Sequence, residues 1–138
     1  MNTCFLSRAV LISIHQALSQ RIRCVLKEVR AYGQAVILLK KLEEVLLIYF
    51  ERQSLAFYYE LKDRYAAECE TGKMVVFLQK DLEDLKVDFL ELMEKYQEHT
   101  NPIRMRNFPK DFLDFSSRLK DRMALEYEYL MPLLPEKK

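Results

Sequence analysis

Glycine is scarce in this sequence, and its scarcity excludes the loops that usually hold nucleotides. Only Gly33 and Gly72 occur in 138 residues. A P-loop, a dinucleotide-binding loop and a nucleophile elbow each need at least two closely spaced glycines. None of these motifs is present, so the sequence argues against nucleotide chemistry.

The cysteines of this sequence indicate neither cross-links nor a metal site. The three cysteines, Cys4, Cys24 and Cys69, are an odd number and include no C-x-x-C pair. This pattern predicts neither a disulfide framework nor a zinc site. Free cysteines commonly act as small buried apolar side chains, and we expect that role here. A reducing cytoplasm is the predicted location.

Excess charge of one sign and long apolar runs are also missing. The formal net charge is +1, whereas a nucleic-acid-binding domain normally carries a strongly basic face or tail. The N-terminal segment is interrupted by Arg8 and His15 and does not have the pattern of a signal peptide. The most apolar run, residues 35–50, contains two lysines and two glutamates, too many for a membrane span. We therefore expect neither nucleic acid nor membrane as a direct partner.

Histidine is too rare to indicate a catalytic system. A Ser/His/Asp or Cys/His arrangement would need His15 or His99, but His99 falls at a predicted helix end and His15 has no partner that the sequence identifies. A histidine phosphotransfer domain needs an exposed histidine that is usually followed closely by lysine and glycine, whereas Gln-Ala-Leu-Ser follows His15. We predict no catalytic residues, no enzymatic activity and no cofactor. An enzyme is therefore the third hypothesis, after the two binding functions described below.

What the sequence does contain is typical of a helical bundle. Half of the residues are apolar and 31% are charged. Apolar residues recur at helical spacing over four stretches. The predicted helices cover about 6–32 (ending at Gly33), 34–68, 74–99 (after a break at 70–73 that contains Gly72), and a last helix that starts near Pro109. These predict one all-α domain over residues 1–138, an antiparallel up-down-up-down four-helix bundle.

The last helix carries two charges where a core is expected. The apolar stripe of residues 112–134 is interrupted by Arg122 and Glu126, which lie one turn apart and can pair. The apolar members of the stripe are Phe112, Phe115, Leu119, Leu130 and Leu133. His15, Tyr49 and Gln53 are polar residues close to the buried sides of the first two helices. We predict that His15, Tyr49, Gln53, Arg122 and Glu126 form an inner polar layer that fixes helix register, in preference to a ligand role.

Two stretches, LLIYFERQSLAFYYELK and LKDRMALEYEYLMPLL, resemble the second and fourth helices of hemerythrin-like proteins. The resemblance follows the helix order over nearly the whole chain and implies a hemerythrin-like bundle. At that family's metal-ligand positions this sequence has His15, Tyr49, Gln53, Leu82, Arg122 and Glu126. A guanidinium repels a cation, so we expect no metal; any metal would be held by His15 and Glu126. A degenerate hemerythrin-like domain that binds metal or a small ligand is the alternative function.

The same helices are similar to the Rsd/AlgQ regulators, which bind the principal sigma factor of bacterial RNA polymerase. LEEVLLIYFERQSLAFYYEL matches that family's V-L-x-x-Y core and a later tyrosine at Val45, Leu46, Tyr49, Tyr58 and Leu61. LKDRMALE matches its L-x-x-R-F-x-L-E-D segment at Leu119, Arg122, Leu125 and Glu126. The family's S-A-G-H-F segment is replaced by residues 51–55, and its second acidic residue by Tyr127.

The second resemblance accounts for Arg122 and Glu126, which the first does not. It implies a non-enzymatic regulator that binds the principal sigma factor or another RNA polymerase component. The residues expected to contact such a partner are Tyr58, Tyr65, Arg104 and Arg106. Spare leucine and tyrosine side chains on the second helix also predict a homodimer.

Overall fold

The computed structural model describes residues 6–97 and 100–136. The helices are α1 (Arg8–Lys27), α2 (Tyr32–Arg52), α3 (Leu55–Arg64), α4 (Cys69–Lys95), α5 (Pro102–Leu125), a π-helical segment η1 (Glu126–Leu130) and a 3₁₀ turn η2 (Met131–Leu133). No strand occurs within the described ranges. The prediction of an all-helical bundle is confirmed.

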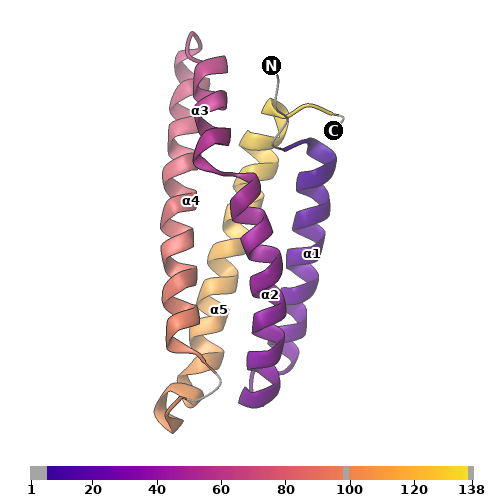
Figure 1. Cartoon of the computed structure of the whole chain (residues 1–138), viewed down its shortest axis with the longest axis vertical. Helices are drawn as coiled ribbons and strands as arrows, with labels where there is room; N and C mark the ends of the chain where they lie inside the picture. Colours follow the sequence, from indigo (N-terminus) through magenta and orange to yellow (C-terminus); the bar gives the residue numbers. More distant parts are fainter. Residues whose placement is uncertain (1–5, 98–99, 137–138) are drawn as a thin grey trace.

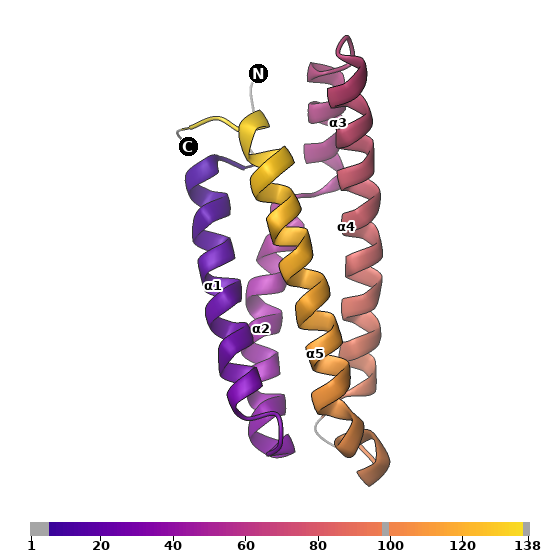
Figure 2. The same ribbon diagram turned by 180° about the vertical axis from the view of Figure 1, so that it is seen from behind.

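The helices form a bundle of two neighbouring pairs (Figures 1 and 2). One pair is α1 and α2, and the other is α4 and α5. Helix α3 continues from the end of α2 but lies against α4. The start of α1 and the turn η2 lie at the same end of the bundle, where the Arg8 side chain donates hydrogen bonds to the carbonyls of Met131 and Leu134.

Three helices begin at side chains that accept a hydrogen bond from the first turn, as helix N-termini require. Ser7 Oγ accepts from the amide of Val10 (3.2 Å) at the start of α1. Ser54 does the same for Phe57 at α3 (3.2 Å). Asn101 Oδ1 accepts from the amide of Arg104 (2.8 Å), which starts α5 earlier than predicted. Arg104 and Arg106 therefore lie on the first turns of α5, not in a loop.

Contrary to the prediction from the sequence, the two glycines do not end helices. Helix α1 ends at Lys27, and Gly33 lies in the first turn of α2. The second break falls at residues 65–68, and Gly72 lies in the first turn of α4. Neither glycine has a positive φ, so neither uses the left-handed conformation that favours glycine after a helix end.

The second predicted helix is broken into α2 and α3. The break occurs at Gln53 and Ser54, where Gln53 is the residue after the last turn of α2 and Ser54 is the N-cap of α3. The change of direction separates α3 from the line of α2 (Figure 1). It also explains why Tyr59 is 61% exposed, while Phe57 and Tyr58 are buried.

The core continues through the helices as one cluster of leucine, isoleucine, valine and aromatic side chains. Near the C-terminus, the π-helical segment changes which residues face this core. In this segment the Met131 amide donates to the Glu126 carbonyl, five residues earlier. A π turn contains one residue more than an α turn. Leu130 therefore stays buried, but the next buried position is Leu134, and the predicted Leu133 is only half-buried.

The two described cysteines do not occupy the buried sites expected of them. Cys24 is half-buried and Cys69 is exposed, while Cys4 lies outside the described residues, as does His99. Cys69 is the first residue of α4. Over the described residues, none of the helices combines the length and apolar character that a membrane span requires.

Candidate functional site: a buried polar layer

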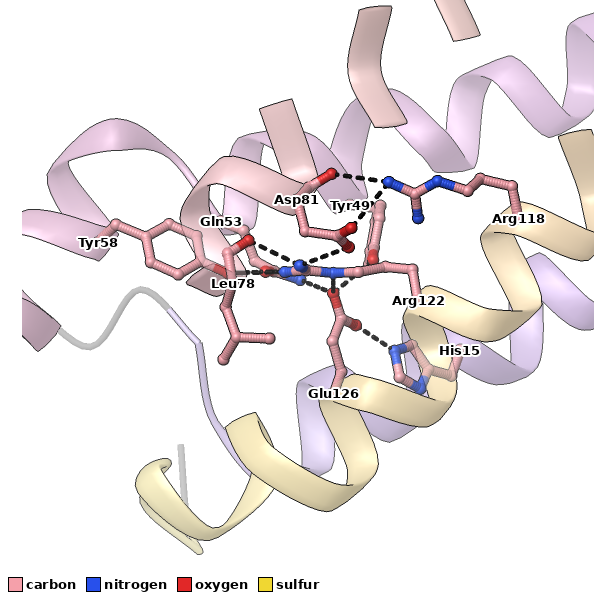
Figure 3. A network of polar contacts seen from close by, with 9 residues as sticks. All are labelled: His15, Tyr49, Gln53, Tyr58, Leu78, Asp81, Arg118, Arg122 and Glu126. Carbon is pink, nitrogen blue, oxygen red and sulfur yellow. Dashed lines mark hydrogen bonds and ion pairs between the residues drawn. The ribbon is translucent and has the colours of Figure 1, made fainter. Parts of the chain in front are cut away.

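The site lies inside the bundle at the end of α5, where Arg122 and Glu126 are both 0% exposed (Figure 3). His15 reaches it from α1, and Tyr49 and Gln53 reach it from α2. These side chains are also buried, with exposed fractions of 4% or less. The inner polar layer predicted from the sequence is thus brought together in one place.

The carboxylate of Glu126 is the centre of the layer. Its Oε1 is 2.6 Å from Nε2 of His15. Its Oε2 accepts hydrogen bonds from Tyr49 Oη (2.5 Å), Gln53 Nε2 (2.8 Å) and Arg122 Nε (2.7 Å). Both oxygens are therefore used, which removes most of the cost of burying an ionised carboxylate.

The guanidinium of Arg122 is similarly saturated. Besides Glu126, it donates from Nη1 to the carbonyl of Leu78 (2.7 Å) and to Asp81 Oδ2 (3.2 Å). From Nη2 it donates to Gln53 Oε1 (3.0 Å) and to the hydroxyl of Tyr58 (2.8 Å). The Arg122 side chain thus joins α5 to α2, α3 and α4 in a single set of hydrogen bonds.

Asp81 connects this buried layer to the protein surface. Its Oδ1 accepts from Arg118 Nη2 (2.9 Å), and the side chains of these two residues are 16% and 30% exposed. Arg118 also donates to the carbonyl of Asp81 (3.2 Å). With Glu126 and Arg122, these residues make two carboxylates and two guanidiniums, so the formal charges of the four cancel.

The environment of the layer shifts the pKa values of its members in opposite directions. Burial raises the pKa of Glu126, but the hydrogen bond from His15 and the charge of Arg122 outweigh it, so the pKa lies below its ordinary value. Burial lowers the pKa of Arg122, and the neighbouring Glu126 charge more than reverses this effect. Burial, with the Glu126 charge, raises the pKa of Tyr49, and burial also raises that of Tyr58. At neutral pH the layer therefore contains a carboxylate, a guanidinium and neutral phenols.

Of the residues expected to contact a partner, Tyr58 is misassigned. It is 1% exposed, and its hydroxyl donates to Gln53 Oε1 (2.6 Å) while accepting from Arg122. It is therefore a member of the polar layer. Tyr65 is half-buried against the core, whereas Arg104 and Arg106 are exposed at the start of α5.

Asp81 and Arg118 are not among the residues predicted from the sequence. Asp81 lies beside the apolar stripe of α4, between the buried Leu78 and Leu82, and its position alone resembles that of other solvent-facing acids. The Leu78 contact uses a backbone carbonyl, which no side-chain pattern indicates. A usable signal would have been the spacing of Arg118 and Arg122, which places two arginines one turn apart on the same helix.

Comparisons of this chain with protein family models, with curated proteins and with solved structures give no significant match. The possible chemistry of the site is therefore inferred from its geometry.

Chemically, the layer is better suited to holding helices together than to holding a metal ion. Among residues 6–97 and 100–136, no group of three or more His, Cys, Asp and Glu side chains could hold a metal ion. The Arg122 guanidinium donates to Glu126 Oε2 and to Asp81 Oδ2, so it contacts both carboxylates that a cation would need. Leu82, at another position where the resemblance placed a ligand, is a buried apolar side chain. His15 and Glu126 would have to give up their mutual contact to share a cation.

Proposed function

We propose that this chain is a non-enzymatic regulatory binding protein of the Rsd/AlgQ type. Its partner is the principal sigma factor of RNA polymerase or another polymerase component. The observation that carries the proposal is the saturated pair Arg122 and Glu126, which the Rsd/AlgQ resemblance includes in one segment and which is fully buried here. A layer whose charges are all paired has a structural role, which leaves the outer surface for function.

The scaffold of this proposal is an antiparallel, up-down-up-down bundle of hemerythrin-like type. The short turn at residues 28–31 supports it, since a connection of this length returns the chain alongside α1. So does the pairing of α4 with α5 and of α1 with α2. Helices α2 and α3 together take the place of the second helix of such a bundle.

Exposed apolar side chains on α2 and α3 support a protein as the partner. Leu47 and Ile48 near the end of α2 are 53% and 48% exposed. Leu55 and Tyr59 on α3 are 55% and 61% exposed. Exposed leucine and tyrosine side chains on both sides of a helix break are the kind of residues that anchor protein interfaces. Tyr59 replaces Tyr58 as an expected tyrosine contact, and Tyr65, Arg104 and Arg106 stay predicted contacts.

The test is direct binding of the purified chain to a purified principal sigma factor by isothermal titration calorimetry. We expect saturable binding, and we expect Leu55→Asp to weaken it by about tenfold, the loss of one well-packed apolar anchor. Leu90→Asp is the matched control, because Leu90 is 54% exposed on α4 and lies outside both this patch and the start of α5. No measurable heat with sigma factor, or equal losses for both variants, would contradict the proposal.

The same apolar residues would also fit a second copy of the chain, which is the homodimer expected from the sequence. Sedimentation velocity measures this separately from sigma binding. A dimer that Leu55→Asp converts to monomer would support it, whereas a monomer at all concentrations would remove it.

The alternative is a degenerate hemerythrin-like domain that binds a metal or a small ligand. For the metal form, protein loaded with iron, manganese or zinc would retain about one equivalent after dialysis, and His15→Ala and Glu126→Ala would lose it. The contacts of Arg122 with both nearby carboxylates argue against this form. The small-ligand form has specific support at His15.

A further inference from the structure

One polar atom of the layer has no partner. His15 uses Nε2 for its contact with Glu126, but its Nδ1 is buried and makes no hydrogen bond within the described part of the chain. The residue is 3% exposed. Buried polar atoms without a hydrogen bond are few in folded proteins, because each has lost its hydration without a replacement, at a cost in stability. A group that meets Nδ1 from outside the chain would remove this cost.

The His15 ring borders a groove between α1 and the junction of α5 with η1. The groove has a volume of about 260 Å³, several times the roughly 30 Å³ that a water molecule occupies in the liquid. It is lined by His15, Gln16, Ser19, Arg23, Met123 and Tyr127. The Tyr127 ring meets the His15 ring edge to face, with 5.1 Å between their centroids, and forms one wall. The groove is thus bordered by a histidine whose Nδ1 is buried and has no hydrogen-bond partner among the described residues.

The polar groups of the groove are arranged along one ridge of α1. His15, Ser19 and Arg23 are spaced one helical turn apart, so their side chains follow each other on the same face. They present an imidazole nitrogen, a hydroxyl and a guanidinium in that order. Arg23 is exposed and has no ion pair or hydrogen bond with any residue that the structure describes. A free guanidinium next to a hydroxyl and an imidazole favours an oxyanion over a cation.

The hydrogen bond to Glu126 determines whether Nδ1 of His15 can accept or donate a hydrogen bond in each state of the ring. Glu126 is ionised and can only accept, so Nε2 of His15 must donate to it. A neutral ring then has a lone pair at Nδ1, and a protonated ring has an N–H there. A phosphate group carries negatively charged oxygens and, when singly protonated, a P–OH group as well. It can therefore pair with Nδ1 in either state of the ring.

We propose that the groove formed by His15, Ser19, Arg23 and Tyr127 is a binding site for a phosphate group, free or carried by a small organic molecule. In this site Arg23 supplies the charge and Ser19 and His15 supply hydrogen bonds. The Tyr127 ring is placed to contact an organic group attached to the phosphate. The proposal does not depend on the protein-binding function, since the groove is distinct from the apolar patch on α2 and α3.

The test is titration of the ¹⁵N-labelled full chain with inorganic phosphate and, in a second series, with phenyl phosphate. Sodium chloride at matched ionic strength is the reference. We expect saturable shifts of the amide signals of Gln16, Ser19, Arg23 and Tyr127 and of the ring nitrogens of His15. Tighter binding of phenyl phosphate would indicate a phosphate monoester, and equal binding would indicate free phosphate. Shifts that stay linear for both compounds would overturn the proposal.

The variant Arg23→Gln separates this site from general attraction of anions to a surface. Removing one charged hydrogen-bond donor should weaken phosphate binding by about tenfold. Arg30→Gln is the matched control, because Arg30 is exposed in the turn after α1 and does not line the groove. Both substitutions are at exposed positions, so the folded bundle should be retained. Equal weakening by both variants, or none by Arg23→Gln, would overturn the assignment.

Discussion

Arg122 Nε, in the last turn of α5, lies 2.7 Å from Oε2 of Glu126, the first residue of η1, and neither side chain reaches solvent. This pair is buried with its hydrogen bonds made, which is the condition under which a buried ion pair is tolerated. Its partners come from α1, α2, α3 and α4, so a change of register in any of these helices would break a hydrogen bond. We regard this as the reason for polar residues inside an otherwise apolar core.

Replacing Arg122 alone should be severely destabilising. Arg122→Met leaves Glu126 and Asp81 near each other without their shared guanidinium, and we expect a loss of about 3–5 kcal/mol in the free energy of unfolding. The double variant Arg122→Met with Glu126→Leu should lose at least about 1 kcal/mol less than the sum of the two single variants. Urea unfolding followed by circular dichroism measures all three. Additive losses would show that the two residues do not interact.

The stability of the chain should fall in acid because of Glu126. Its pKa is lower in the folded chain than its ordinary value of 4.5, so its stabilising contribution is fully present above that value. The contribution is lost as the pH falls through the lower pKa of the folded state. We expect the urea midpoint of the wild type to fall from about pH 5 downward and that of Glu126→Gln to fall less steeply. Parallel curves would contradict this role of Glu126.

Loss of a single hydroxyl distinguishes the buried from the exposed tyrosines. Tyr49→Phe removes one donor to the buried Glu126 carboxylate and should cost about 1.5–3 kcal/mol. Tyr59→Phe is the control, since Tyr59 is 61% exposed, and it should change the stability by less than about 0.5 kcal/mol. The measurement is the midpoint of urea unfolding at pH 7. Similar small effects of both variants would mean that the Tyr49 hydroxyl is hydrated in solution.

Gly33 provides a test of the helix boundaries. In the structure it lies inside the first turn of α2, without a positive φ and with open space where a Cβ would be. Gly33→Ala should therefore raise the stability by about 0.5–1 kcal/mol, the difference in helix propensity. If Gly33 instead ended α1 in the left-handed conformation, as the sequence suggested, the same substitution would lower the stability.

The polar layer could be predicted because a gap in a helical stripe is a local signal. Arg122 and Glu126 stand four residues apart where apolar residues should be, and His15, Tyr49 and Gln53 fall on or near the buried sides of their helices. The partners that were missed depend on tertiary structure. Asp81 lies beside the stripe of α4 and becomes part of the layer only because Arg122 and Arg118 reach it across the bundle.

The helix boundaries were harder to predict, because glycine was the expected signal for the ends of the first two helices. Glycine lowers helix stability only modestly, and a first turn tolerates it well. The break that positions Tyr58 is made by Gln53 and Ser54, and its sequence signal is a serine three residues before Phe57, whose amide it caps. The π-helical segment after Glu126 has no sequence pattern of its own, so the shift from Leu133 to Leu134 was not foreseen.

The most direct test of the buried pair is the side-chain NMR signal of Arg122 Nε–H at pH 7. A guanidinium that is buried and bonded to Glu126 should give a sharp Nε–H signal that exchanges slowly with water and that shifts or disappears in Glu126→Gln. Exposed arginines such as Arg106 supply the reference for rapid exchange. An Arg122 signal that exchanges as fast as that of Arg106, and that Glu126→Gln leaves unchanged, would contradict the structural role assigned to this layer.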